Sequence, residues 1–514
     1  MSPLAAAATS AWIASSAPGW RRFKAALAAP EAAQRGVLAA VLENVTGTAL
    51  GRDHGLPGRF DDLEPRTYED LLPYIQRAAD GEAGALSRAP ITRFEPTSGS
   101  NSASKLIPST GLLRAQFEAA IQPWMFDLYS HRPRLLGGPA YWSISPVLSR
   151  PATAGGIPVG FEEDSAYLGR WGKALVDRAL AVPGGVRIEQ DTERFLDLTL
   201  VCLLAAADLR LISVWNPTFL DILLDRLIAA WERLLGMLRA GVRVGDRIVA
   251  APRRAAALRR LSPDSVTALW PRLGLLSAWG DAGAAPLLPR LAARLGPVEV
   301  QPKGLLATEA ALSIPFEGRF PVALLSAYVE LLTDDGAILP LHRWQVDQQG
   351  ELLLSQGGGL VRYRLGDRVQ VTGMAERTPC IRFLGRGGRV SDRFGEKLSE
   401  PFVASALGRL GLQGFAVLAP DGPGYTLYAE APPPDAPARL EAALRENVHY
   451  GWCVDLGQLQ PCRVFAIEGD GAAAWLRWRS ALGQRLGDIK APSLHLADEL
   501  GAVFRGRYLG APCP

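Results

Sequence analysis

From about residue 90 onwards, segments with apolar residues at helical spacing alternate with short apolar runs that end at glycine or proline. Three of these runs are RLGLLSAWG (272–280), PVEVQPKGLLATE (297–309) and VALLSAYVELL (322–332). Such alternation is typical of α/β proteins, in which layers of helices cover a sheet. It constrains the fold more than any other feature of the chain, and we predict an α/β architecture.

Several long segments predict helices. Residues 1–90 are expected to be mainly helical, and the clearest helices there run from Glu31 to Val45 and from Tyr68 to Ala79. The apolar segment from Val214 to Leu235 predicts one long helix that follows Pro217.

The segment GGGLVRYRLGDRVQVTGM (357–374) alternates apolar and polar residues as a strand does. A glycine followed by aspartate favours a tight turn. We therefore expect an antiparallel strand pair that turns near Gly366-Asp367.

The C-terminal portion predicts a small α+β unit. Ser399 and Pro401 are typical of the N-cap and first turn of a helix, which we expect to run through Leu410. The strand-like segments GFAVLAP and GYTLYAE follow, and another helix is expected from about Pro437 to Arg445.

A chain of 514 residues exceeds what one hydrophobic core usually organises. The glycine-rich polar segment at 385–400 is the natural place for a junction. We predict a large N-terminal domain at residues 1–385 and a small, mobile α+β C-terminal domain at residues 386–514.

Charge and hydropathy exclude several classes of function. The chain has 55 basic and 52 acidic residues, so nothing favours a nucleic-acid or membrane surface as partner. The apolar run LVCLLAAADLRLISVW contains Asp208 and Arg210, and four hydroxyl residues between 9 and 16 interrupt the apolar N-terminus, which also lacks the basic start of a signal peptide. We expect an amphipathic first helix and a cytoplasmic protein.

The five cysteines are scattered and form no C-x-x-C pair, and the five histidines show no metal-ligand spacing. Neither a disulfide framework nor a zinc site is predicted, which fits a reducing compartment. Any metal is expected to be an oxygen-bound cation that arrives with a substrate.

The segment FEPTSGSNSASKLIPST (94–110) groups small hydroxyl residues and a glycine ahead of Lys105. Backbone N–H groups, hydroxyls and an ammonium group can surround phosphate oxygens. The segment is not a Walker A loop, because Ser104 stands where that motif has glycine. Taken alone, such a loop is more often a solvated connector.

Three further motifs are equally short: Thr308-Glu309 within KGLLATEAALSIPF (303–316), Asp367 within YRLGDR (363–368) and Lys490 within WRSALGQRLGDIKAPSLHL (478–496). Taken singly they are interpreted as a turn, an Asx-turn and a surface lysine. A carboxylate after a strand can instead hold a divalent cation between nucleotide phosphates. A carboxylate beside glycine can accept both hydroxyls of a ribose.

Taken in order, these motifs resemble the acyl-adenylate-forming superfamily: TSG(S)…K, WGDAGAAPL, LLATE, YRLGD, GR…GEKL and a C-terminal lysine. More narrowly, the chain resembles the auxin-conjugating acyl-acid amido synthetase family and its bacterial relatives. EPTSGS…K-LIP, ISVWNPTFL (212–220), KGLLATEA, RYRLGDRV, GRGGRVSDRFGEKL and LGDIKAP carry this resemblance, which extends from about residue 10 to the end.

The resemblance implies a two-step ligase. A carboxylic acid attacks the α-phosphate of ATP, with Mg²⁺ as the metal cofactor, and an amine, usually that of an amino acid, then displaces AMP to form an amide. No general base is required for the first step, because the acid is already ionised at pH 7, and this fits the scarcity of histidine.

The resemblance also implies which residues contact the nucleotide. Those expected at the β- and γ-phosphates are Thr97, Ser98, Gly99, Ser100 and Lys105, and those at the adenine edge are Gly280, Asp281 and Ala282. Those expected elsewhere around the nucleotide are Asp367 at the ribose, Arg386 at ribose or phosphate, and Gly304 with Leu305. Leu305 stands where the wider superfamily often carries an aromatic residue that stacks on adenine.

For the chemistry itself, the resemblance implies that Glu309 holds Mg²⁺ with Thr308 beside the α-phosphate. Lys490 would reach from the small domain to the forming acyl-phosphate oxygens. We hypothesise that the small domain rotates about residues 386–392 between the two half-reactions. Ser102 departs from the family pattern, since relatives usually carry a second glycine there, which has more backbone freedom.

The acid pocket is expected among the helices between about 115 and 225. The bulky candidates there are Trp124, Trp142, Trp215 and Phe219. Aromatic residues of this kind belong to the plain core about twice as often as they line a ligand. If some face the ligand, an aromatic or hydrophobic acid would suit them. No arginine or lysine is identified as partner of the acid's carboxylate.

Three alternatives remain for the function. The leading one is amide synthesis from a carboxylic acid and an amine or amino acid, by a monomer or weak homo-oligomer. A second keeps the adenylation and transfers the acyl group to the thiol of coenzyme A or of a carrier protein. A third, an inactive adenylate-like scaffold, is disfavoured because Lys105, Glu309, Asp367 and Lys490 are all present.

Overall fold

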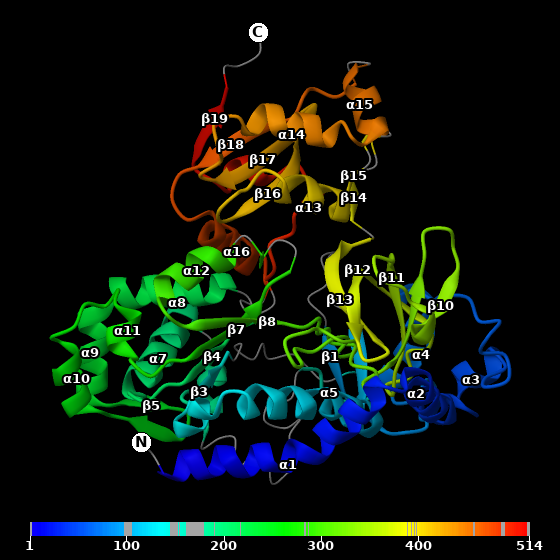
Figure 1. Cartoon of the computed structure of the whole chain (residues 1–514), viewed down its shortest axis with the longest axis horizontal. Helices are drawn as coiled ribbons and strands as arrows, with labels where there is room; N and C mark the ends of the chain where they lie inside the picture. Colours follow the sequence, from blue (N-terminus) through cyan, green and yellow to red (C-terminus); the bar gives the residue numbers. More distant parts are fainter. Residues whose placement is uncertain are drawn as a thin grey trace.

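The computed structural model (Figure 1) describes most of the chain. The residues described are 3–96, 105–143, 153, 155–160, 179–189, 191–215, 217–281, 284–285, 287–387, 389–391, 393–394, 396, 398–455, 458–484 and 489–510. Among the helices that the structure describes, none combines the length and apolar character that a membrane crossing needs.

A parallel sheet forms the centre of one half of the large N-terminal domain. Its strands, in spatial order, are β3 (Ala140–Trp142), β4 (Leu211–Ser213), β7 (Leu275–Trp279) and β8 (Glu299–Lys303). Side chains of one face pack with the helices α7 (Thr192–Ala205), α8 (Pro217–Ala229), α9 (Trp231–Ala240) and α12 (Leu287–Leu295). The other face packs with α1 (Pro3–Leu27) and α5 (Gly111–Ser130). Both faces are thus covered, as parallel sheets require.

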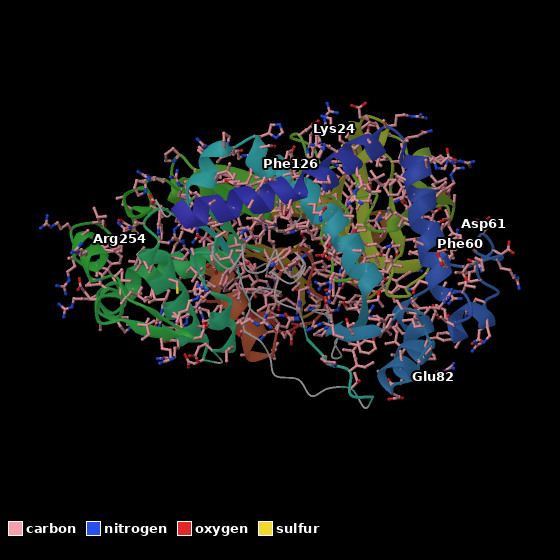
Figure 2. The ribbon with its side chains drawn as sticks, turned by 90° about the horizontal axis from the view of Figure 1, so that it is seen from below. Lys24, Phe60, Asp61, Glu82, Phe126 and Arg254 are labelled. Atoms are coloured by element: carbon pink, nitrogen blue, oxygen red, sulfur yellow. The ribbon has the colours of Figure 1, made fainter. Side chains whose placement is uncertain are left out.

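Helices α1 and α5 lie side by side along the underside of the molecule (Figure 2). Trp20 of α1 packs against Phe126 of α5 with ring centres 5.3 Å apart. The same core cluster continues into the second half of the large domain.

An antiparallel sheet organises that second half. Its strands, in spatial order, are β10 (Ile338–Pro340), β9 (Tyr328–Leu332), β11 (Gln349–Ser355), β12 (Tyr363–Ala375) and β13 (Thr378–Arg386). Helix α2 (Pro30–Val45) packs near β9, and α4 (Tyr68–Ala79) begins with a capping box formed by Thr67 and Asp70. The two helices predicted in these regions are confirmed.

The predicted turn at Gly366-Asp367 is wrong. Strand β12 runs through both residues, and the chain turns only after Ala375. Gly366 has φ = 82°, and Leu365 to Asp367 oppose the single residue Leu352 of β11. The dipeptide therefore forms a bulge, which bends a strand without ending it.

The single long helix predicted from Val214 to Leu235 is also wrong. Strand β4 ends at Ser213, and the helical part is divided between α8 and α9 at Ala230, whose φ and ψ are −106° and 14°. Helix α9 buries Leu234, Leu235 and Leu238 along one stripe and packs on α10 (Pro252–Leu258). The apolar content of this segment predicted one helix. Two helices form instead, because α8 packs on α12 whereas α9 packs on α10.

The described part of the large domain also contains shorter elements. They are α3 (Ala49–Asp53), β1 (Ile91–Pro96), β2 (Leu106–Thr110), η1 (Pro133–Gly137), η3 (Gly184–Ile188), β5 (Val242–Val244), β6 (Arg247–Val249), α10 (Pro252–Leu258), α11 (Val266–Leu269) and η5 (Leu341–Arg343).

The small C-terminal domain lies above the large one in Figure 1 and has its own sheet. The strands of this sheet are, in spatial order, β16 (Ala416–Asp421), β17 (Gly424–Glu430), β18 (Arg463–Ile467) and β19 (Gly506–Leu509). The other elements that the structure describes here are β14 (Val390–Ser391), β15 (Leu398–Ser399), α13 (Glu400–Gly408), α14 (Ala436–Leu444), α15 (Val448–Asp455), α16 (Gly471–Ala481) and η7 (Leu500–Ala502).

Ser399 caps α13 as predicted, since its hydroxyl accepts the N–H of Phe402, but the helix ends at Gly408 rather than Leu410. The predicted α/β architecture with a large and a small domain is confirmed. Strand β13 ends at Arg386, and the boundary at 386 stays a prediction.

Candidate active site

Four charged residues from separate segments lie close together at one site. Lys105 precedes β2, Glu309 follows β8, Asp367 lies in the bulge of β12 and Arg386 ends β13. Asp367 and Arg386 face each other in register, and Arg386 Nε donates to Asp367 Oδ1 over 3.1 Å. The structure thus brings together four residues that the sequence motifs singled out.

Electrostatics show how closely these groups interact. Burial raises the pKa of the Glu309 carboxyl, while the cations of Arg386 and Lys105 act against that rise. The carboxylate of Asp367 adds to it, because two nearby negative charges repel. The pKa of Arg386 is raised, most strongly by Asp367 and further by Glu309. Such a cluster offers cations to the negative charges of a polyanion and carboxylates to a metal ion that accompanies it.

Aromatic rings fix the position of Lys105. Its ammonium lies 5.2 Å from the ring centre of Tyr68 and donates to the phenol oxygen of Tyr363 over 3.5 Å. The Tyr68 hydroxyl in turn accepts the N–H of Leu106, the residue after the lysine. The cation therefore stays at the end of the segment that joins β1 to β2.

The predicted phosphate loop itself lies outside the described residues. This applies to Thr97, Ser98, Gly99, Ser100 and Ser102, and also to Ala282 at the predicted adenine edge.

The other residues predicted at the nucleotide lie past the carboxyl ends of β7 and β8, where ligands bind in α/β sheets. Asp281 accepts the N–H of Phe383 over 3.2 Å, and burial raises the pKa of its carboxyl. Gly280 closely faces Pro302, and a Cβ on Gly304 would lie 2.0 Å from the carbonyl oxygen of Ser313. Glycine is therefore required at position 304.

Leu305 and Thr308 occupy the segment between this edge and Glu309. The N–H of Leu305 donates to the Ser313 hydroxyl over 2.9 Å, and the side chain is buried. Thr308 is half-buried directly beside the buried Glu309. The residue that the resemblance predicts beside adenine is thus a buried aliphatic one.

Lys490 comes from the small domain and reaches the large one. Its ammonium lies 4.8 Å from the ring centre of Trp279, the last residue of β7. The Trp279 ring packs edge-on against Phe383 of β13. The lysine predicted to enter the site therefore lies at the carboxyl edge of the parallel sheet.

Sequence reasoning missed a second lysine at this edge. Lys303 ends β8 and is 3% exposed, and its ammonium donates to Ser213 Oγ over 2.6 Å. Three indole rings surround it at 5.0, 5.2 and 5.3 Å, those of Trp124, Trp142 and Trp215. The position directly before GLLATE, at the end of a predicted strand, was the available signal.

The three tryptophans were among the residues predicted for the acid pocket, and the fourth candidate lies elsewhere. Phe219 packs in the core cluster on the opposite face of the sheet, whereas Trp124 belongs to the cluster on the α5 side. The structure therefore brings the tryptophans together without Phe219.

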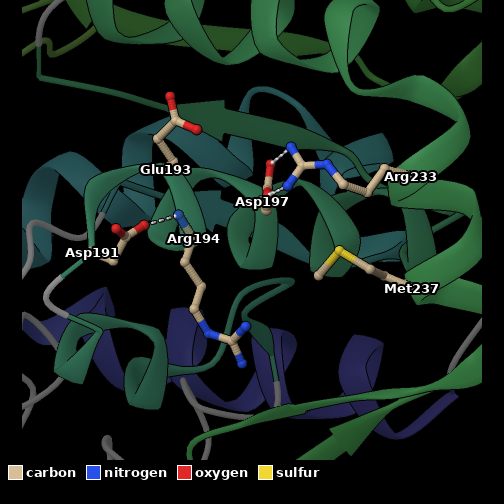
Figure 3. A pocket seen from close by; sticks show the side chains of 6 residues that line it. All are labelled: Asp191, Glu193, Arg194, Asp197, Arg233 and Met237. Carbon is tan, nitrogen blue, oxygen red and sulfur yellow. Dashed lines mark hydrogen bonds and ion pairs between the residues drawn. The ribbon is translucent and has the colours of Figure 1, made fainter.

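A pocket away from this edge has a different character (Figure 3). Six residues line it: Asp191, Glu193, Arg194, Asp197, Arg233 and Met237. Its buried carboxylate, Asp197, already pairs with Arg226 and Arg233. Among the described residues no three His, Cys, Asp or Glu side chains gather as metal ligands, here or elsewhere. An ion-pair network lines this pocket.

Comparison with known proteins identifies the family. Residues 19–300 match the GH3 family N-terminal domain, and residues 322–386 match the GH3 family central domain. The chain belongs to the GH3 family. It is an ATP-dependent acyl acid amido synthetase, a ligase that adenylates an acid and conjugates it to an amino acid.

Two curated relatives illustrate the similarity. A probable indole-3-acetic acid-amido synthetase of Oryza sativa subsp. japonica is 26% identical over 455 residues, which covers 78% of this chain and 73% of the relative. The jasmonoyl–L-amino acid synthetase JAR4 of Nicotiana attenuata is 23% identical, and the match covers 69% of this chain and 68% of the relative.

The fold agrees with a solved member of the family. A GH3.15 acyl acid amido synthetase in complex with 2,4-DB superposes with a TM-score of 0.82 at 19% identity, covering 95% of both chains.

Proposed function

We propose that this GH3 enzyme adenylates an aromatic carboxylic acid at the site where Lys105, Glu309, Asp367 and Arg386 meet. The convergence of these four charged side chains from four segments carries the proposal. A nucleotide triphosphate needs cations for its phosphates and acceptors for its ribose, and the cluster supplies both.

At the triphosphate, Lys105 together with Thr97, Ser98, Gly99 and Ser100 contacts the β- and γ-phosphates. The position of Lys105 supports this role. The residue directly precedes β2, at the end of the predicted phosphate loop, and its ammonium lies over the Tyr68 ring. A fixed cation there offsets the repulsion between the anionic acid and the nucleotide.

Glu309 fits Mg²⁺ as a ligand, with Thr308 beside the α-phosphate. Burial and the nearby carboxylate of Asp367 disfavour the charged form of Glu309, and a divalent cation would offset both effects. Mg²⁺ prefers oxygen ligands, which Glu309 and the nucleotide would both offer. Mg²⁺, when bound, neutralises phosphate charge.

For the nucleoside, Asp367 accepts the ribose hydroxyls and Arg386 contacts ribose or phosphate. Asp367 and Arg386 form an ion pair with each other in the structure. Binding of ATP would therefore replace part of this interaction with contacts to the nucleotide. Adenine lies along Gly280, Asp281 and Ala282, with Gly304 and Leu305 beside it. The aliphatic surface of Leu305 then replaces aromatic stacking.

Lys490 stabilises the negative charge that develops on the oxygens between acid and α-phosphate. Its ammonium already lies at the edge of the parallel sheet, over Trp279. The attacking acid needs no base because it is ionised at neutral pH. We propose that the enzyme is a monomer or weak homo-oligomer.

The acid is proposed to bind among Trp124, Trp142 and Trp215, with its carboxylate directed to Lys303. Indole faces suit an aromatic ring, and a lysine gives the carboxylate a charged partner away from water. The relatives' names include indole-3-acetic acid, an aromatic acid.

A screen of carboxylic acids for ATP-dependent pyrophosphate release tests the proposal. We expect aromatic acids to give the highest rates, and mass spectrometry of products formed with mixed amino acids to find amides. Comparison of amino acids, hydroxylamine and coenzyme A as acceptors identifies the acceptor class. Absence of pyrophosphate release with every acid, or thioesters as the sole products, would overturn it.

A further inference from the structure

Helix α12 of the large domain is joined to the small domain by ion pairs. Arg290 Nη1 lies 2.9 Å from Glu430 Oε2, and Arg290 Nη2 lies 3.3 Å from Asp470 Oδ2. Glu430 ends β17 and Asp470 caps α16, so both carboxylates belong to the small domain. Figure 1 shows α16 directly above α12.

Apolar packing continues the same contact. Leu287, three residues before Arg290 on α12, is 2% exposed and lies in one cluster with Phe415, Val417 and Ile489 of the small domain. Ile489 directly precedes Lys490. The helix that carries Arg290 therefore supports the segment that carries the lysine.

The carboxylates keep other partners without the arginine. Glu430 accepts the backbone N–H groups of Phe415, Gly471 and Ala472, and Asp470 accepts that of Ala473. Removal of the guanidinium therefore leaves no buried carboxylate without donors inside the small domain. The effect falls on the contact between the domains.

We infer that Arg290 is a positioning residue for the adenylation step. Its ion pairs hold the small domain in the orientation that keeps the Lys490 ammonium over Trp279. Rotation of the small domain for amide formation has to break them. The inference rests on the role proposed for Lys490 in adenylation.

The ion pairs of Arg290 are strong enough to favour one orientation of the small domain, and weak enough to break when the domain rotates. Arg290 is 37% exposed and Glu430 8%, so water screens the pair in part. Loss of both ion pairs of Arg290 is expected to lower the ratio of docked to undocked enzyme about five- to tenfold.

Arg290→Met tests the inference, with Arg409→Met as the control. Arg409 forms an ion pair with Glu446 inside the small domain, at 2.7 Å, so the control removes one guanidinium without touching the interface. The two half-reactions are measured separately, as acid-dependent pyrophosphate release and as amide formation from supplied acyl-adenylate.

We expect Arg290→Met to lower kcat for pyrophosphate release about five- to tenfold, with KM for ATP and the rate of amide formation within about twofold of wild type. Arg290→Lys should restore part of the loss, since it keeps the charge. An unchanged kcat for pyrophosphate release, or equal losses in both half-reactions, would overturn the inference.

Hydrogen exchange separates this inference from the proposed function. Residues 489–495 of Arg290→Met should exchange faster than those of wild type and of Arg409→Met, whatever the activity. Equal exchange in the three proteins would refute the docking role of Arg290. Absence of pyrophosphate release by wild type with every acid would refute the proposed adenylation role instead.

Discussion

Asp367 and Arg386 face each other across β12 and β13, and the guanidinium Nε donates to the carboxylate over 3.1 Å. The Gly366-Asp367 bulge lies at this pair, at the end of β13 from which the chain continues to the small domain. A ribose bound at Asp367, as proposed, would therefore also meet Arg386, the first residue of the predicted hinge.

Asp367→Asn is expected to raise KM for ATP about tenfold or more, because a charged acceptor for ribose hydroxyls becomes a weaker, neutral one. Pyrophosphate release at varied ATP measures the change. Asp334→Asn is the control, since Asp334 pairs with Arg368 at the exposed end of the same sheet. Equal KM values for both variants would argue against a ribose contact.

Lys490→Ala should lower the rate of adenylation about 10²-fold, the scale for removal of one donor that stabilises developing charge. ATP binding, measured by calorimetry, should remain largely intact, because the proposed contacts of Lys105, Glu309 and Asp367 with the nucleotide do not involve this lysine. Pyrophosphate release at an undiminished rate would refute the role.

Lys303→Met should raise KM for the acid about tenfold while KM for ATP stays the same, because the carboxylate loses a charge-assisted hydrogen bond. Methionine keeps an unbranched side chain among the three indoles. Lys24→Met is the matched control: Lys24 also lies over an indole, that of Trp20 at 4.9 Å, but on the surface. If both variants retain the wild-type KM for the acid, Lys303 does not bind it.

Glu309→Gln should stabilise the ligand-free protein increasingly as pH rises. Burial raises the pKa of Glu309 above its ordinary value of 4.5, so the folded state holds this proton more tightly than the unfolded state. Wild type therefore loses stability relative to the variant as pH rises from 4.5 through the raised pKa. The difference in Tm, measured without ATP and Mg²⁺, should be larger at pH 8 than at pH 5; a constant difference would contradict this.

The same variant should lose pyrophosphate release almost completely, because glutamine cannot supply the anionic oxygen that Mg²⁺ prefers. Gain of stability together with loss of activity would be the signature of a carboxylate retained for function.

Local patterns predicted the helices from Glu31 to Val45 and from Tyr68 to Ala79 well, because helical spacing acts within a few residues. They failed at Gly366-Asp367, where the same dipeptide suits a turn and a bulge. Pairing of β12 with β11 on one side and β13 on the other decided between them.

The order of the motifs by itself indicated the class of reaction and predicted which residues face the nucleotide, Lys105, Glu309, Asp367 and Lys490 among them. Only the tertiary structure decided that Lys105 and Glu309, which are 204 positions apart in the chain, lie close enough for the lysine to lower the pKa of the glutamate. It also decided that Lys303 stands among three indoles and that Arg290 pairs with the small domain. Propensity acts along the chain, whereas proximity between distant residues arises when strands and helices bury their apolar faces together.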